Sequence, residues 1–98
     1  MTTFFMFGKY STEAIKAMSI ERTQQVVNEI KTLGGEVTAM HALLGEYDLL
    51  FCIKLPTVED AIKASVNLNR LTGISFTTCP AITVETFDQL MDSGRDLS

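Results

Sequence analysis

Gly45-Glu46-Tyr47-Asp48 separates two stretches in which apolar and polar residues alternate, at residues 36–44 and 47–55. Alternation of this kind is typical of a strand with one buried face. A glycine in the first position of a two-residue turn suits the type II′ geometry that joins paired strands. The segment therefore predicts a hairpin in which Gly45 and Glu46 form the turn and Tyr47 opens the second strand. Pro56 ends that strand because proline has no backbone N–H to donate.

A strand and a helix precede the hairpin. Residues 4–10 are short, apolar and rich in phenylalanine, which predicts a strand. Ser11 or Thr12 then caps a helix that begins at Glu13. The apolar phase slips near residues 19–20, so we expect a short helix followed by a longer one. Two glycines at residues 34–35 end it.

A second helix and a fourth strand follow the hairpin. Thr57 caps the helix, and Asp60 stands three residues on as an acidic variant of the capping box. Residues 74–80 predict a strand, and a short last helix begins at Thr83 with Phe87, Leu90 and Met91. The buried face of the second helix is predicted as follows: Ala61, Ile62, Ala64, Leu68 and Leu71.

The order βαββαβ predicts an α+β protein with a ferredoxin-like fold: a four-stranded antiparallel sheet with both main helices on one face. Right-handed crossovers predict strands 4–10 and 47–55 as parallel central neighbours, flanked by 74–80 and 36–44. Residues 1–92 form one domain, and residues 93–98 are predicted as a flexible C-terminal tail.

Composition excludes several classes of partner. The chain has 98 residues, enough for one domain, and its formal net charge is −4. An acidic surface repels nucleic acid and anionic membranes, so we expect neither as a partner. No apolar run reaches the roughly 18 residues of a membrane span. Two cysteines do not form a disulfide framework, which predicts a cytoplasmic protein.

Alternation also separates the two faces of the sheet. If Leu44 pairs with Tyr47, then His41 opposes Leu50 and Ala39 opposes Cys52, and paired residues share a face. The face predicted to lie under the helices carries Phe4, Met6, Met40, Leu44, Leu49, Phe51, Ile53, Ile74 and Phe76. The other face, called the open face below, carries Phe5, Phe7, Lys9, Val37, Ala39, His41, Leu43, Leu50, Cys52, Lys54, Ser75, Thr77 and Cys79. The open face is too apolar for water, so we predict a homodimer formed by two such faces.

Polar residues of this region are the candidate site. His41, the only histidine, could move protons or hold a ligand near neutral pH, or form a hydrogen bond across the dimer. Asp48 could pin the hairpin through backbone N–H groups or grip an amine or hydroxyl of a ligand. Tyr47 could pack its ring on the edge of the core, or its hydroxyl could reach water or a ligand. Lys9 and Lys54, predicted at the same end of the sheet, could attract an anion or extend into solvent.

The sequence predicts neither a metal nor a cofactor. Cys52 and Cys79 share the open face, but strand 4–10 lies between their strands. That separation is roughly 9–10 Å, beyond the limit of about 7 Å between the Cα atoms of a disulfide. A zinc site formed by His41 and these cysteines would need a fourth ligand and lacks a close-spaced pair. The chain also has no glycine-rich phosphate loop.

Three segments together resemble the GYD domain family: Gly8-Lys9-Tyr10, the capping pair Ser11-Thr12, and residues 45–48. The resemblance covers roughly residues 3–91 and implies a dimeric α/β barrel built on the ferredoxin-like fold. The turn is also similar, more distantly, to the effector-binding domain of Lrp/AsnC-type regulators. No residues are left here for a helix-turn-helix, so we do not expect a direct transcription factor. Cofactor-free monooxygenases share the barrel at the level of fold alone.

These observations predict a small ligand-binding or accessory domain, a homodimer with a cavity between its two sheets. The ligand would be a small polar or aromatic metabolite contacted by Lys9, His41, Asp48 and Lys54 over Phe5, Phe7 and Leu50. One alternative is a cofactor-independent enzyme of the monooxygenase or isomerase type, with His41 as acid or base supported by Tyr47 or Asp48. Another is a structural assembly module without a ligand.

Overall fold

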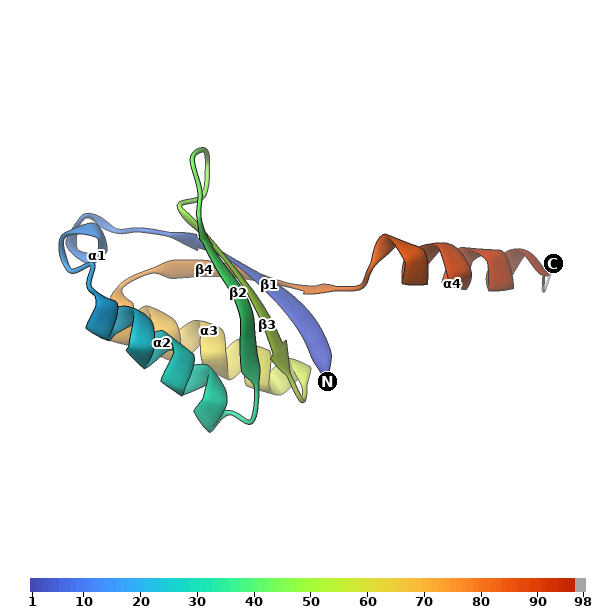
Figure 1. The fold of residues 1–98 in the computed structure, drawn as a ribbon, viewed down its shortest axis with the longest axis horizontal. Coiled ribbons are helices and arrows are strands. Elements are labelled where there is room, and N and C mark those ends of the chain that lie inside the picture. The colour runs from blue at the N-terminus through green and yellow to red at the C-terminus, as the bar shows by residue number, and fades with distance from the viewer. Residues whose placement is uncertain (97–98) are drawn as a thin grey trace.

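A computed structural model describes residues 1–96 of the chain, and the side chains of residues 1–92. The elements follow in the order β1 (Thr2–Lys9), α1 (Thr12–Lys16), α2 (Ile20–Thr32), β2 (Glu36–Ala42), β3 (Leu49–Leu55), α3 (Val58–Thr72), β4 (Ser75–Ala81) and α4 (Val84–Asp96). Figure 1 shows α2 and α3 on one face of the sheet, while α4 extends away from it. The α+β, ferredoxin-like prediction is confirmed.

Side-chain caps fix the helix starts that the sequence predicts. Ser11 Oγ accepts a 3.0 Å hydrogen bond from the Ala14 N–H at the start of α1, and Ser19 Oγ does the same for Arg22 at the start of α2. Each cap satisfies an N–H group that has no partner within its helix. The predicted break between a short and a longer helix is therefore present. Thr57 caps α3 in the same way, and Gly73 ends it in the left-handed conformation, with φ 76°.

The strand order is β2-β3-β1-β4, with β1 and β3 in the centre as predicted. The predicted parallel relation of β1 and β3 is wrong, since they pair antiparallel. The chain path explains the difference. The helical crossover returns β2 parallel to β1, and the hairpin then reverses β3. As a consequence Lys9 and Lys54, each near the C-terminal end of its strand, lie at opposite ends of the sheet.

The hairpin is longer than predicted, and Tyr47 does not open β3. Leu43 donates its N–H to the Asp48 carbonyl at 2.8 Å, so the loop between them has four residues rather than two. Gly45 has φ 147°, a backbone conformation that residues with an L side chain rarely adopt. This explains why a glycine occupies this position of the loop. Leu44 is fully exposed in the loop instead of lying under the helices.

The predicted register of β2 and β3 is confirmed for the pairs His41 with Leu50 and Ala39 with Cys52. A bulge between Val37 and Ala39 then shifts the register by one residue. Val37 consequently lies opposite Ile53 and packs against the core, so its predicted place on the open face is wrong. Thr38, the extra residue, donates its hydroxyl to the Cys52 carbonyl at 2.9 Å.

The core lies between the sheet and the helices α2 and α3. Burial of each large apolar side chain stabilises the fold by roughly 1.5–3 kcal/mol. The largest fully buried side chains are Phe4, Met6, Ile30, Ile53, Leu55, Leu68 and Ile74. Two members of the predicted buried face of α3 are instead exposed: Ile62 by 61% and Leu71 by 46%. The sheet covers a narrower stripe of α3, formed by Ala61, Ala64, Leu68 and Thr72.

α4 runs on to Asp96, into the segment that the sequence predicts as a tail. The side chains of residues 93–96, and all of residues 97–98, lie outside the part of the chain that the structure describes. Within residues 1–96, no helix is both long enough and apolar enough to cross a bilayer.

Candidate functional site

Antiparallel pairing arranges the open face as rows of side chains that run across the four strands. Side chains of one strand alternate between the two faces, so residues opposite one another in the register share a face. The row at the middle of the face consists of Cys79, Phe5, Cys52 and Ala39, and the next one of Thr77, Phe7, Leu50 and His41. The centre of the open face is therefore mostly apolar, and no helix lies over it in Figure 1.

The loop at residues 44–47 covers one end of this face. The ring of Tyr47 lies 5.2 Å from the ring of Phe7, centroid to centroid, at an interplanar angle of 45°. Lys9 Nζ donates a 3.0 Å hydrogen bond to the Glu46 carbonyl. Tyr47 thus packs on the open face rather than on the edge of the core, and Lys9 ties the loop to β1.

Asp48 has the structural role that the turn chemistry suggests. Its Oδ2 accepts a 2.8 Å hydrogen bond from the Tyr10 N–H, and its own N–H donates to the Gly8 carbonyl at 2.8 Å. The side chain is half-buried. These two contacts join the end of β1 to the start of β3, so the carboxylate holds the hairpin in place.

His41 is exposed on β2, an edge strand, opposite Leu50. It is thus at the rim of the apolar floor formed by Phe5, Phe7 and Leu50. Lys54 lies at the far end of the face, where Thr3 and Glu36 are its neighbours in the register. The structure therefore brings His41 to the apolar floor, and it separates Lys54 from Lys9.

The two cysteines flank Phe5 on either side. Cys52 and Cys79 are both opposite Phe5 in the register, and both are free thiols. Strand β1 separates them, as predicted. Among the residues that the structure describes, no group of three His, Cys, Asp or Glu side chains is placed to hold a metal ion.

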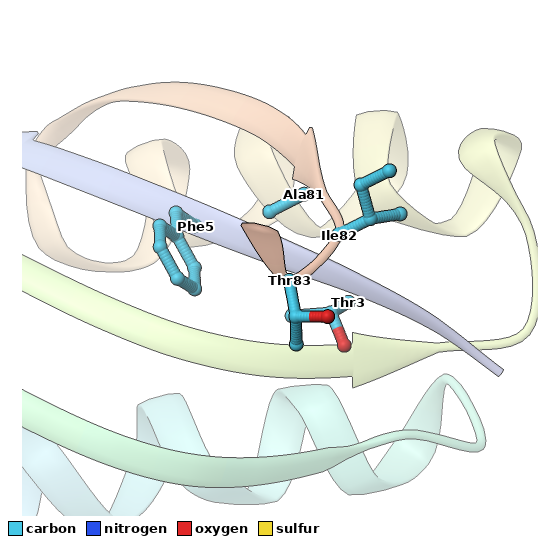
Figure 2. A pocket seen from close by; sticks show the side chains of 5 residues that line it. All are labelled: Thr3, Phe5, Ala81, Ile82 and Thr83. Carbon is cyan, nitrogen blue, oxygen red and sulfur yellow. The ribbon is translucent and has the colours of Figure 1, made fainter. Parts of the chain in front are cut away.

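A depression of about 140 Å³ opens at the end of the face opposite the loop (Figure 2). Its lining consists of Thr3, Phe5, Ala81, Ile82 and Thr83. The sequence predicts only Phe5 as a site residue among these. Thr3 is missed because the first strand is predicted to begin at Phe4, and the others because Pro80 is predicted to end the last strand. In the structure β4 continues through Pro80 to Ala81, which an edge strand allows, since the N–H that proline lacks need not pair.

Comparison with known proteins gives a family and two similar structures. The model of the family described as GYD domain matches residues 4–91. No curated protein matches the chain. The leucine response regulatory protein LrpA of Mycobacterium tuberculosis has a similar structure, with a TM-score of 0.56 and 6% sequence identity. The similarity covers 84% of this chain and 51% of LrpA, so the chain spans about half the length of that protein.

The hypothetical protein PHS023 of Pyrococcus horikoshii is similar over more of its own length. It has a TM-score of 0.53 and 20% sequence identity, over 85% of this chain and 92% of PHS023. At these identities both likenesses establish the fold alone.

Proposed function

The chain belongs to the GYD domain family, and from that premise and the open face we propose that it is a homodimeric small-molecule-binding or accessory domain of the cytoplasm. Two copies would pair open face to open face and enclose a small polar or aromatic metabolite. The two free thiols support a reducing compartment. The fold shared with LrpA supports the architecture of the proposal.

The observation that carries the proposal is the composition of the open face. Phe5, Phe7 and Leu50 form an apolar floor that is not covered by a helix, and Phe5 is 37% exposed. Stacked sheets lie about 10 Å apart, which leaves room for side chains from both faces. A second open face would remove this floor from water, and that burial favours pairing.

The ligand would lie over this floor, next to His41. An exposed imidazole beside apolar and aromatic side chains suits a small molecule with one polar group and one flat or apolar part. Lys54 would contact it only if the molecule reached the far end of the face. Lys9 and Asp48 already bind the Glu46 carbonyl and the Tyr10 N–H, so they would shape the site rather than grip the ligand.

Binding is favoured over catalysis by the role of Asp48. A catalytic histidine needs a group that orients its ring, and Asp48 is the carboxylate proposed for that task. Its Oδ2 instead accepts a hydrogen bond from the Tyr10 N–H and holds the hairpin. The alternative, a cofactor-independent enzyme, would convert the bound molecule to a product, and the experiment below distinguishes this outcome from binding alone.

Native mass spectrometry of the full chain, purified directly from cell extract, tests the proposal. We expect a species of two chains plus a small molecule, which is released on denaturation and stabilises the protein when added back. A ligand at a hundredfold excess over its Kd raises the free energy of unfolding by about 2.7 kcal/mol. Two chains without added mass, together with no stabilisation by a metabolite panel, would favour the structural module and overturn the proposal. Conversion of the recovered molecule to a product would favour the enzyme instead.

The variant Leu50→Asp tests whether the small molecule binds on the open face. A charge at the centre of the apolar floor should abolish the bound mass, because a desolvated carboxylate there has no partner. Ile20→Asp is the matched control, since Ile20 is 79% exposed at the first turn of α2, away from the open face. The control should retain the bound molecule. Retention by both variants would place the ligand elsewhere.

A further inference from the structure

α4 is an amphipathic helix that extends away from the rest of the chain (Figure 1). The radius of gyration is 15.5 Å, whereas about 13 Å is usual for a compact domain of this length. The apolar face of α4 consists of Val84, Phe87, Leu90 and Met91, which are between 50% and 74% exposed. An apolar helix face of this kind normally packs against another element.

A second apolar stripe on the molecule is also uncovered. Val58, Ile62 and Val66 follow one another every four residues along α3, and they are between 45% and 61% exposed. We call these three residues the α3 stripe. A hollow beside it, between α3 and β4, is lined by Ser65, Val66, Asn69, Ser75 and Phe76. Neither the core nor the open face accounts for the α3 stripe.

We propose that α4 is an exchanged arm: the apolar face of α4 in one copy docks on the α3 stripe of a second copy, and the second copy returns the contact. The two helices run antiparallel in this contact, with Met91 near Val58, Phe87 near Ile62 and Val84 near Val66. The occupant of the α3 stripe is therefore α4 of a second copy of this protein.

Charge complementarity sets the antiparallel direction. On a helix of about 3.6 residues per turn, Glu85 and Asp88 lie clockwise from the apolar face of α4, viewed from its N-terminus. Viewed in the same way, Lys63 and Arg70 lie clockwise from the α3 stripe. Glu59 lies on this edge as well, so the edge carries a net charge of +1. Two facing helices bring their clockwise edges together only when they run antiparallel. That orientation places the acidic edge of α4 along this net positive edge of α3, with Lys63 nearest to Glu85 and Asp88.

The same argument disfavours docking of α4 on its own α3. Both β3 and β4 are antiparallel to β1, so they run in the same direction, and α3 between them runs in the opposite one. If α4 folded back over β4, it would run parallel to its own α3. Its acidic edge would then lie on the side away from Lys63 and Arg70.

The hinge also directs the arm outward. Only Ile82 and Thr83 separate β4 from α4, and Thr83 already caps α4 by accepting a 3.1 Å hydrogen bond from the Thr86 N–H. Pro80 restricts the backbone just before the hinge to extended conformations. Figure 2 shows Thr83 beside Thr3, on the face of the sheet opposite α3. A short, stiff hinge of this kind favours exchange between copies over closure within one chain.

Exchange also explains how a contact of small area, between α4 and the α3 stripe, can be stable. Stable interfaces bury at least about 1,200 Å² in total, more than one face of a short helix supplies. Reciprocal docking doubles the area, while the loss of translational and rotational freedom is incurred once. Because its residues lie on α3 and α4, this interface is separate from the open face.

Disulfide trapping tests the direction and the partner of the contact. In a Cys52→Ala, Cys79→Ser background, chains with Val58→Cys and chains with Met91→Cys are produced together and oxidised. We expect the mobility to shift from one chain to a disulfide-linked pair of different chains. Val58→Cys produced with Val84→Cys is the matched control, because antiparallel docking separates these positions by most of the length of α4.

Three outcomes would overturn the proposal. One is linkage in the control pair at the level of the test pair, which would indicate parallel docking. Another is linkage within single chains that carry both Val58→Cys and Met91→Cys, without linkage between chains. The third is no linkage at all in protein that elutes as folded, with wild-type circular dichroism.

Charge reversal provides a second measurement that does not depend on cysteines in the contact. Lys63→Glu with Arg70→Glu should lower the association constant by about tenfold or more, since like charges then face each other across the contact. Adding Glu85→Lys and Asp88→Lys to the same chain should restore it. Loss without restoration would contradict the proposed alignment of the two edges.

The proposal stands apart from the function proposed for the open face. Leu50→Asp should abolish the bound small molecule and leave the disulfide between Val58→Cys and Met91→Cys chains intact. Phe87→Asp should have the opposite effect, with loss of the exchanged arm and retention of the ligand. Each variant therefore tests one surface.

Discussion

The Asp48 carboxylate accepts a 2.8 Å hydrogen bond from the backbone N–H of Tyr10, a residue 38 positions earlier in the chain. This contact holds the loop at residues 44–47 against the end of β1. From there Tyr47 reaches Phe7, and Lys9 reaches the Glu46 carbonyl. The segment at residues 45–48 thus lies against one end of the open face.

Asp48→Ala should lower the free energy of unfolding by about 1.5–3 kcal/mol, the usual contribution of a hydrogen bond to a charged group. Asp48→Asn keeps an acceptor without the charge, so it should cost less. Urea denaturation measures both losses. Glu46→Ala is the control, because only the Glu46 backbone takes part in the contact with Lys9. Equal effects of Asp48→Ala and Glu46→Ala would contradict a structural role for the carboxylate.

Tyr47→Ala should expose Phe7 and lower the free energy of unfolding by about 1–3 kcal/mol, from lost burial and a lost aromatic pair. Tyr47→Phe keeps the ring and should leave stability within about 0.5 kcal/mol of the wild type. Urea denaturation again gives both values. If Tyr47→Phe instead lost the bound small molecule at unchanged stability, the hydroxyl would be a ligand contact and packing would not be its main role.

Cys79 reports on pairing of the open faces. It is exposed in a single chain and lies beside Phe5, on the edge strand β4 at the end of the middle row of the open face. A bulky maleimide should therefore alkylate Cys79 about tenfold more slowly when paired chains outnumber free chains by about ten to one. Leu50→Asp should remove this protection, and Ile20→Asp should keep it. Rapid alkylation of the wild-type protein at high concentration would show that the open faces do not pair.

Local chemistry made much of the fold predictable. Ser11 and Thr57 cap their helices as their residue types suggest, Gly73 ends α3 in the left-handed conformation, and the register of His41 with Leu50 follows from alternation. The antiparallel relation of β1 and β3 also follows from the chain path, and the predicted parallel pairing is wrong because it leaves out the reversal at the hairpin. It placed Lys9 and Lys54 together, and the structure separates them.

Other parts of the site depend on tertiary contacts that alternation does not encode. Asp48 and Tyr10 meet because the hairpin folds over the end of β1. Ile62 is exposed because the sheet reaches only one side of α3. The place of Val37 depends on the bulge at Thr38, since a single extra residue exchanges the two faces of the strand beyond it. No feature of residues 36–42 marks that position in advance.

The bulge leads to a last prediction. Deletion of Thr38 leaves Val37 opposite Ile53 and Ala39 opposite Cys52, so that consecutive residues of β2 face consecutive residues of β3. The protein should therefore fold, with a loss of about 1 kcal/mol for the hydrogen bond from Thr38 to the Cys52 carbonyl. Deletion of Cys52 is the matched control. It removes a paired residue from a central strand, moves the adjoining side chains to the wrong face, and should abolish folding. Circular dichroism with urea denaturation compares the two. Failure of both variants would show that the fold needs the local twist of the bulge, because the pairing alone is preserved when Thr38 is removed.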